Sequence, residues 1–192
     1  MTWADPGSLC FKGLIFEIYR RTVVLAEGTT FVQELAAVPD IVRVYPVLAM
    51  SEVVMIQEYR REVDATILRV VSGTIEDGES PEEAGRRELR EELGLLADRL
   101  QLFSVSIPML KVRHRIHHFV VYDPALSEQQ LEIGEDIRPW PIRLAGLDEL
   151  LASEDLLEDS VISGLLRLRA ALASAGIGDP PSVLGEAGRV SV

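Results

Sequence analysis

Three glutamates that could bind a metal ion lie close together near the middle of the chain. Glu88 and Glu92 are four positions apart and Glu91 lies between them, so a helix places all three on one side. Like charges at this spacing destabilise a helix by roughly 0.2–0.5 kcal/mol per pair unless a cation lies beside them. Hard divalent cations such as Mg²⁺ take several carboxylate oxygens as ligands. This arrangement therefore predicts a Mg²⁺ site.

Opposite charges at helical spacing surround these glutamates and have a simpler explanation. Such pairs stabilise a solvated helix by roughly 0.2–0.5 kcal/mol each and need no function. Such ion pairs account for any single charged residue in this helix, but the three glutamates together still carry surplus negative charge. The predicted pairs are Glu82–Arg86, Glu83–Arg87 and Arg87–Glu91.

Clear start and stop signals bound the helix that must position the glutamates. Ser80 suits the N-cap, Pro81 suits the first helical position, and Glu83 completes a capping box with Ser80. Gly94 suits the left-handed residue that ends a helix. The glutamates therefore lie in the second half of a short, well-capped helix.

Strands precede and follow this helix. Alternating and β-branched residues predict a meander of two or three strands within residues 11–37. Mixed strands with helices in the middle and at the end predict an α/β sandwich with a mixed sheet and a small N-terminal antiparallel β appendage. The other predicted strands span residues 41–49, 52–59, 66–71, 101–107, 112–122 and 137–143, and two later helices span residues 145–152 and 160–175.

The chain divides into three predicted parts. Residues 1–40 form an N-terminal β-strand segment, residues 41–175 form the main domain, and residues 176–192 form a flexible tail rich in glycine and proline. Exposed apolar strands in the first part favour a surface that pairs with a second copy, so we expect a homodimer.

Charge and composition exclude several classes of partner. The 192 residues carry a net charge of −12, whereas nucleic-acid polymers and anionic membranes attract clustered Lys and Arg. No apolar run approaches the roughly 18 residues of a membrane span, and the first residues lack the pattern of a signal peptide. Cys10, the single cysteine, cannot form an internal disulfide, which favours a reducing, cytoplasmic location.

Residues 73–95 resemble the Nudix box. That motif is a glycine, five residues, a glutamate, seven residues, and then Arg-Glu-hydrophobic-any-Glu-Glu-any-Gly-hydrophobic. Nine constrained positions at fixed spacing make this match far more specific than a short glycine pattern. The resemblance implies a Nudix α/β/α sandwich that hydrolyses a nucleoside diphosphate linked to another group. The matching residues are Gly73, Glu79, Arg87, Glu88, Leu89, Glu91, Glu92, Gly94 and Leu95.

The resemblance also implies the metal ligands. Glu88 and Glu92 would be the principal ligands of Mg²⁺ (or Mn²⁺), and the main-chain carbonyl of Ser72 would complete the coordination sphere. Glu91 is expected among both the metal-binding and the catalytic residues.

Catalysis in this family implies two further features. Arg87 would pair with Glu79 and hold the metal-binding glutamates in place. A nearby carboxylate would take a proton from the attacking water. We expect Glu135 to be this base, with Glu132 as the alternative.

The flanking sequence narrows the substrate. Residues 57–60, Gln-Glu-Tyr-Arg, resemble the Glu-Gln-Tyr-Arg run of ADP-ribose pyrophosphatases, and Pro108 falls about where that subfamily carries a proline. The implied reaction splits ADP-ribose to AMP and ribose 5-phosphate, with Arg60 and Pro108 as substrate contacts. Arg60 has an equally good alternative as the surface ion-pair partner of Glu58 or Glu62.

One departure from the subfamily keeps other substrates open. The subfamily has Glu-Leu-Pro-Ala-Gly or similar before the box, whereas residues 69–73 are Arg-Val-Val-Ser-Gly, so Arg69 replaces an acid with a base. The alternatives are another nucleoside diphosphate sugar or a dinucleotide. A Nudix-fold module that only senses a nucleotide is expected to lose box glutamates, and this chain keeps them.

Three further features have both a plain and a functional interpretation. The basic stretch at residues 113–118 is best interpreted as a solvated strand, in which alternation sends His117 and His118 to opposite faces. Trp140 is expected in an interface or the core rather than against a base. Phe16 and Tyr19 could stack on the adenine of a partner subunit's substrate.

Overall fold

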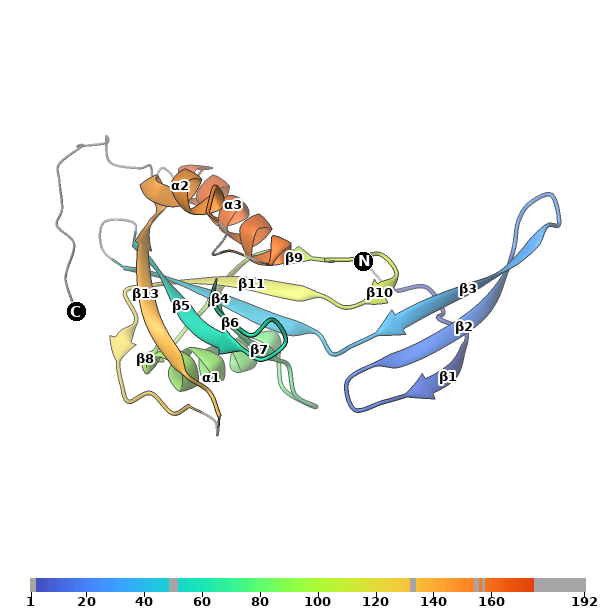
Figure 1. The fold of residues 1–192 in the computed structure, drawn as a ribbon, viewed down its shortest axis with the longest axis horizontal. Coiled ribbons are helices and arrows are strands. Elements are labelled where there is room, and N and C mark those ends of the chain that lie inside the picture. Colours follow the sequence, from blue (N-terminus) through green and yellow to red (C-terminus); the bar gives the residue numbers. More distant parts are fainter. Residues whose placement is uncertain (1–2, 49–51, 132–133, 154–155, 157, 175–192) are drawn as a thin grey trace.

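Two larger β-sheets organise the chain, as Figure 1 shows. The structure is a computed structural model, and it describes residues 3–48, 52–131, 134–153, 156 and 158–174. The predicted tail at residues 176–192 lies outside the described residues.

The smaller sheet extends away from the rest of the molecule (Figure 1). Three antiparallel strands build most of it, as the meander predicted. A short strand from later in the chain adds to it in parallel, so the N-terminal segment does not form this sheet alone. Its strands are β1 (Ser8–Lys12), β2 (Glu17–Val24), β3 (Thr30–Ala37) and β10 (Val112–Arg113).

The larger sheet is mixed, as predicted. Its central pair, β4 with β11, is parallel, and the other pairs are antiparallel. The main order is β13-β5-β4-β11-β9, with β6 paired to β5 and β7 paired to β4. These strands are β4 (Ile41–Leu48), β5 (Glu52–Arg60), β6 (Ala65–Arg69), β7 (Val71–Thr74), β9 (Gln101–Ser106), β11 (Ile116–Tyr122) and β13 (Ile137–Arg143). A separate two-stranded sheet pairs β8 (Leu95–Leu96) with β12 (Ala125–Leu126).

Two strand predictions were wrong in the same way, because each joined two strands into one. Residues 66–71 split into β6 and β7 at Val70, since β6 pairs with β5 while β7 pairs with β4. Residues 112–122 split into β10 and β11, since the two belong to different sheets. At the first split, β4 and β5 separate from each other. They pair directly only where Val47–Leu48 meets Glu52–Val53.

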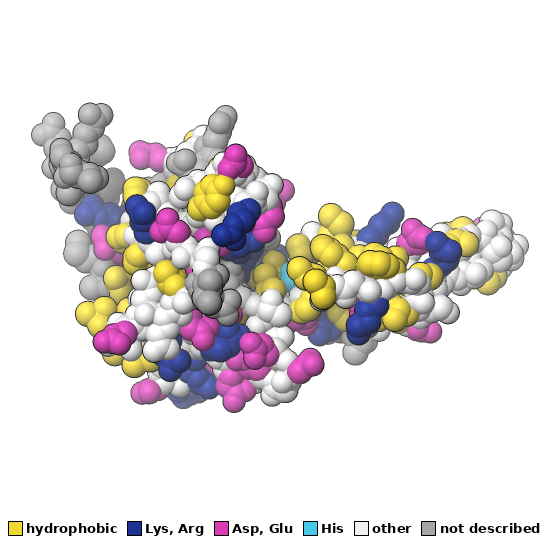
Figure 2. Space-filling model, turned by 60° about the horizontal axis from the view of Figure 1, so that its bottom comes forward, with side chains coloured by type: hydrophobic (Ala, Val, Ile, Leu, Met, Phe, Trp, Pro, Cys, Tyr) yellow, Lys and Arg dark blue, Asp and Glu magenta, His cyan; other side chains and the backbone are white. Residues whose placement is uncertain are grey.

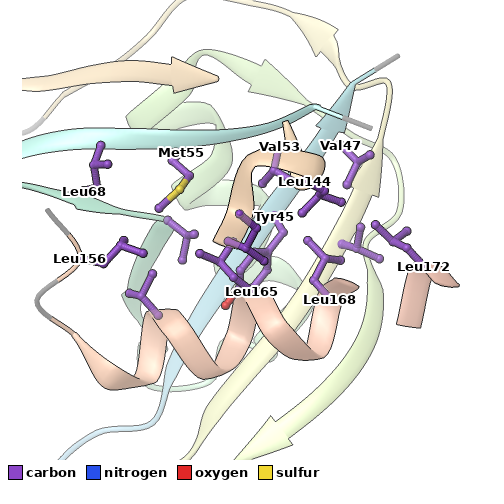
Figure 3. Close-up of a cluster of buried hydrophobic side chains, with 14 residues drawn as sticks. Tyr45, Val47, Val53, Met55, Leu68, Leu144, Leu156, Leu165, Leu168 and Leu172 are labelled. Carbon is purple, nitrogen blue, oxygen red and sulfur yellow. The ribbon is translucent and has the colours of Figure 1, made fainter. Parts of the chain in front are cut away.

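Helices cover both faces of the large sheet (Figure 1). Helix α1 (Pro81–Leu93) packs against one face over a core that contains Val44 and Leu89. Helix α3 (Asp159–Ser174) covers the other face together with the short α2 (Leu147–Leu151), which follows a 3₁₀ turn, η2 (Leu144–Gly146). Figure 3 shows the second core, in which Tyr45 and Leu165 lie between the sheet and α3. No helix among the described residues is long and apolar enough to cross a membrane.

The interpretation of residues 113–118 as a solvated strand was wrong for its last histidine. His118 is fully buried, its Nδ1 lies 3.0 Å from the Tyr45 hydroxyl, and its Nε2 lies 2.8 Å from the Ser106 hydroxyl. His117 points elsewhere, with Nε2 3.9 Å from the Asp40 carboxylate, as strand alternation predicted. Burial lowers the pKa of His118 to about 4, so this histidine is a neutral core residue at pH 7.

Trp140 is not a core residue. It lies in β13, an edge strand of the large sheet, and its side chain is exposed. The flanking Pro139 and Pro141 fit this edge position, because proline cannot donate a hydrogen bond to a further strand.

Candidate active site

Helix α1 is capped as predicted, and the caps set which side chains face the sheet. Glu83 N donates to the Ser80 hydroxyl over 3.3 Å, and Ser80 N donates to the Glu83 carboxylate over 2.8 Å. Gly94 closes the helix with φ of 60° in the left-handed region. The side chain of Glu83 caps the helix, so the predicted Glu83–Arg87 pair is not formed. The other two predicted pairs are present, at 3.0 Å for Glu82–Arg86 and 3.2 Å for Arg87–Glu91.

An acidic cleft of about 370 Å³ lies between α1, the split strands and the segment before β13. Six carboxylates and three arginines line it, so its formal charge is negative even with every arginine paired. The charged residues are Glu58, Arg60, Arg69, Glu76, Arg87, Glu88, Glu91, Glu92 and Glu135.

Gly73 makes room for the first metal-binding candidate. A Cβ built on Gly73 would overlap the carboxylate of Glu88, so any larger residue at this strand position displaces that side chain. Gly73 thus brings the carboxylate of Glu88 directly against the main chain of β7.

Arg87 clamps three carboxylates on the same side of the cleft. Its Nε and Nη2 atoms bind the two oxygens of Glu79 at 3.0 and 3.1 Å. Its Nη1 atom donates to Glu88 over 2.6 Å and to Glu91 over 3.2 Å, and Nη2 also donates to the carbonyl of Thr74. The hydrogen bond from Arg87 lowers the pKa of Glu79, which keeps this pair charged.

Glu92 is the most deeply buried acid of the cleft. Its side chain accepts a hydrogen bond from Ser72 N over 3.1 Å. Burial, and then the charge of Glu88, raise the pKa of Glu92 well above its usual value. Burial also raises the pKa of Glu88, although Arg87 opposes the shift. A buried carboxylate beside a partly buried one is costly unless a cation joins them.

The donor chemistry of the cleft fits a hard divalent ion. Glu88 and Glu92 would hold it with Ser72, and Glu91 lies between these two glutamates on α1. Within the described part of the chain, no three Asp, Glu, His or Cys side chains converge as a ready-made metal site. A bound ion would thus rest on the Glu88–Glu92 pair and on a main-chain oxygen.

The other predicted residues are distributed unequally around this cleft. Glu135 lines it, and its charge contributes to the raised pKa of Glu88. Arg60 lines it as well, but pairs with both Glu58 and Glu62 at 2.9 Å. Pro108 lies in the exposed loop after β9 and is not among the cleft-lining residues. Glu132 lies outside the described residues.

The sequence interpretation missed an ion-pair network at the split in the sheet. Arg69 pairs with Glu58 and, over 2.8 Å, with Glu158, which also pairs with Arg43 at 2.6 Å. Arg43 is 2% exposed and Glu58 is 7% exposed. Charged residues inside apolar strand runs are rarely buried without a partner. This pattern was the signal in the sequence that could have revealed the network.

Comparisons with known proteins agree with this geometry. The NUDIX domain family matches residues 39–163, which include every residue that lines the cleft. An ADP-ribose pyrophosphatase from Bacillus subtilis is 28% identical over 127 residues, which cover 66% of this chain and 69% of that protein. A methanol dehydrogenase activator from Bacillus methanolicus is 27% identical with the same coverage.

A solved structure extends the likeness to the fold. The crystal structure of an ADP compounds hydrolase matches with a TM-score of 0.77, over 88% of this chain and 92% of that chain. The two sequences are 24% identical, so this match supports the fold alone. The family match spans well over half of the 192 residues and contains the whole acidic cleft, and the chain therefore belongs to the Nudix hydrolase family.

Proposed function

We propose that this Nudix hydrolase uses Mg²⁺ (or Mn²⁺) to split the pyrophosphate bond of ADP-ribose, which yields AMP and ribose 5-phosphate. The observation that carries the proposal is the pair of buried Glu92 and partly buried Glu88, whose surplus negative charge a divalent ion would offset. When bound, the ion would lower the pKa of a coordinated water and neutralise charge on the pyrophosphate.

The side chains around the pair have separate parts in this reaction. Water attacks one phosphorus, the bond from that phosphorus to the bridging oxygen breaks, and the proton of the water passes to a carboxylate. Glu135 is our candidate for this base because it lines the cleft and acts electrostatically on Glu88. Arg87 and Glu79 keep the glutamates oriented.

Arg60 is our candidate for a phosphate contact. Its guanidinium lies at the cleft beside Glu58 and Glu62, and its side chain is 35% exposed. A planar guanidinium binds phosphate oxygens well, and a substrate phosphate would compete with the solvent-exposed Glu62 for it. Pro108 stays a proposed contact that would need the loop after β9 to approach the substrate.

The choice of ADP-ribose rests on likeness rather than on a base-binding pocket. The Gln-Glu-Tyr-Arg run and the Bacillus subtilis relative favour it. No aromatic side chain is among the described residues that line the cleft, so this part of the cleft suits the diphosphate rather than the base.

A homodimer would supply a surface for binding the base. Figure 2 shows hydrophobic side chains gathered along the extended N-terminal sheet. A contiguous apolar surface of this kind is typical of an interface, and Phe16 or Tyr19 of a partner could then stack on adenine. The exposed apolar residues include Leu9, Phe11, Leu14, Ile15, Phe16, Phe31 and Val32.

A substrate panel tests the proposed reaction. Purified protein with Mg²⁺, then with Mn²⁺, is assayed on ADP-ribose, ADP-glucose, GDP-mannose, NADH, a diadenosine polyphosphate and a nucleoside triphosphate. Preference for ADP-ribose supports the proposal, and preference for another compound keeps the metal chemistry and refutes the substrate. No turnover on any compound refutes the enzyme and favours a nucleotide-sensing module.

Two matched variants of α1 separate the cleft from the rest of the helix. Glu92→Gln should abolish turnover and leave the fold intact, because it removes one buried charge without changing size. Glu82→Gln serves as control, because Glu82 pairs with Arg86 and does not line the cleft. Equal turnover of the two variants would contradict the assignment of Glu92.

A further inference from the structure

The side chain of Arg69 reaches three different parts of the molecule at the split in the sheet. Its Nη1 binds Glu58 of β5, its Nε binds Glu158 beside α3 at 2.8 Å, and its Nη2 binds the hydroxyl of Ser72 at 3.0 Å. The guanidinium is 14% exposed and lines the acidic cleft. Each of its nitrogens is therefore engaged by the protein, which favours an orienting role over direct contact with a substrate.

Ser72 connects Arg69 to the metal-binding acids. Its hydroxyl accepts from Arg69, and its main-chain N–H donates to Glu92 over 3.1 Å. One residue thus bridges a buried cation and the most buried carboxylate of the cleft. The same residue is our candidate for the main-chain ligand, so a shift of Ser72 would disturb two ligands together.

The charge of Arg69 supports the same orienting role. Its guanidinium pairs with the carboxylates of both Glu58 and Glu158, which hold the positive charge in place. Glu58 and Glu92 both line the cleft, and Arg69 is the least exposed of the three arginines that line it with them.

We infer that Arg69 is a positioning residue, which orients Glu92 and Ser72 for metal binding and is itself held by Glu58 and Glu158. This inference rests on the proposed metal-dependent function. Residues that hydrogen-bond to metal ligands orient those ligands, and their loss weakens metal binding by about 10- to 100-fold. Ion pairing across the split also ties the start of α3 to the cleft.

Mn²⁺ binding, measured by electron paramagnetic resonance on the full chain without substrate, tests the inference. Arg69→Met should weaken Mn²⁺ binding by about 10- to 100-fold. Ser72→Ala should weaken it by a smaller factor, because the main chain of Ser72 is kept. The double variant should bind no more weakly than Arg69→Met, since both changes break the same connection. Arg86→Met is the control, because Arg86 lies on α1 but pairs outside the cleft.

Several results would overturn the inference. Wild-type Mn²⁺ affinity in Arg69→Met, together with a lower melting temperature, would mean that Arg69 only stabilises the fold. A raised KM with unchanged Mn²⁺ affinity would mean that Arg69 contacts the substrate directly. If Arg69→Met does not fold, Ser72→Ala decides, and wild-type affinity in that variant refutes the inference.

Different results would refute the proposed function. Wild-type protein that binds no Mn²⁺, or binds it no better than Glu92→Gln does, would refute the metal site and the inference with it. Normal binding by wild type that only Glu92→Gln abolishes would refute the inference alone.

Discussion

Gly73 offers a way to move Glu88, a proposed metal ligand, without changing the chemistry of its side chain. A Cβ built on Gly73 overlaps the Glu88 carboxylate, and real Cβ atoms essentially never approach other heavy atoms within 3.0 Å. In a Gly73→Ala variant, the side chain of Glu88 must therefore leave its position against β7.

The effect of this change on folding should be small, because opposing contributions nearly cancel. Glu88 loses its 2.6 Å hydrogen bond from Arg87, and a bond between charged groups is worth roughly 1.5–3 kcal/mol. The displaced carboxylate regains water, and burial is the main cause of its raised pKa. Alanine in place of glycine in a strand adds roughly 0.5–1 kcal/mol of stability. The free energy of unfolding without metal should change by about 1 kcal/mol or less.

The effect on activity should be large. Displacing a ligand costs at least as much as disturbing the residues that orient it, so turnover should fall by roughly 100-fold or more. The assay is turnover on the preferred substrate over a Mg²⁺ series, with urea denaturation in EDTA as the measure of stability. Gly146→Ala is the control, because a Cβ at Gly146 meets no atom within 4 Å.

Two results would refute this reasoning. Wild-type turnover in Gly73→Ala would show that the position of Glu88 does not matter for catalysis. A loss of several kcal/mol in stability would show that the strand, rather than the carboxylate, had to move. Adding Glu88→Gln to Gly73→Ala should lower turnover little further, because both changes remove the same ligand.

The buried histidine, the metal cleft and the N-terminal sheet each predict one further outcome. His118 has a pKa of about 4 in the fold against about 6.5 in the unfolded chain, so the unfolded chain binds the proton more tightly. Its contribution to stability is complete above pH 6.5 and falls by roughly 3 kcal/mol as the pH drops towards 4. Urea denaturation across this range should show a shallower pH dependence in His118→Gln, and equal slopes would contradict the assignment. Mg²⁺ at 100 times its dissociation constant should raise the free energy of unfolding by about 2.7 kcal/mol in wild type but not in Glu92→Gln, as thermal melts can test. Phe16→Glu should convert the proposed dimer to a monomer in analytical ultracentrifugation, and a monomeric wild type would contradict the dimer.

Local signals predicted the helix that carries the site. Ser80, Glu83 and Gly94 act within one or two turns of each other, so their effect depends little on the rest of the fold. The same local rules located most strands, because alternation and turn residues are read over a few positions.

Signals that depend on distant partners were misread. The runs at residues 66–71 and 112–122 look continuous, and only their partners show that each changes sheet or neighbour part-way. His118 looks like a surface cation, and its burial depends on Tyr45, 73 residues away. The choice of a distant strand partner and the ion pairs between distant segments leave no periodic trace in the sequence.

The sequence by itself determined the family of this protein, because the nine matching residues lie in one capped helix and the short segments on either side of it. They include the acids of the proposed metal site and the arginine that pairs with two of them. The sequence also marked Arg69 as unusual, since a base replaces the acid of the resembling subfamily. Only the tertiary structure decided which partners Arg69 has, because Glu58 and Glu158 lie 11 and 89 residues away from it. Arg69 and these two glutamates meet where β4 and β5 separate. Such a split in a sheet depends on how the strands pair, which no short stretch of residues determines.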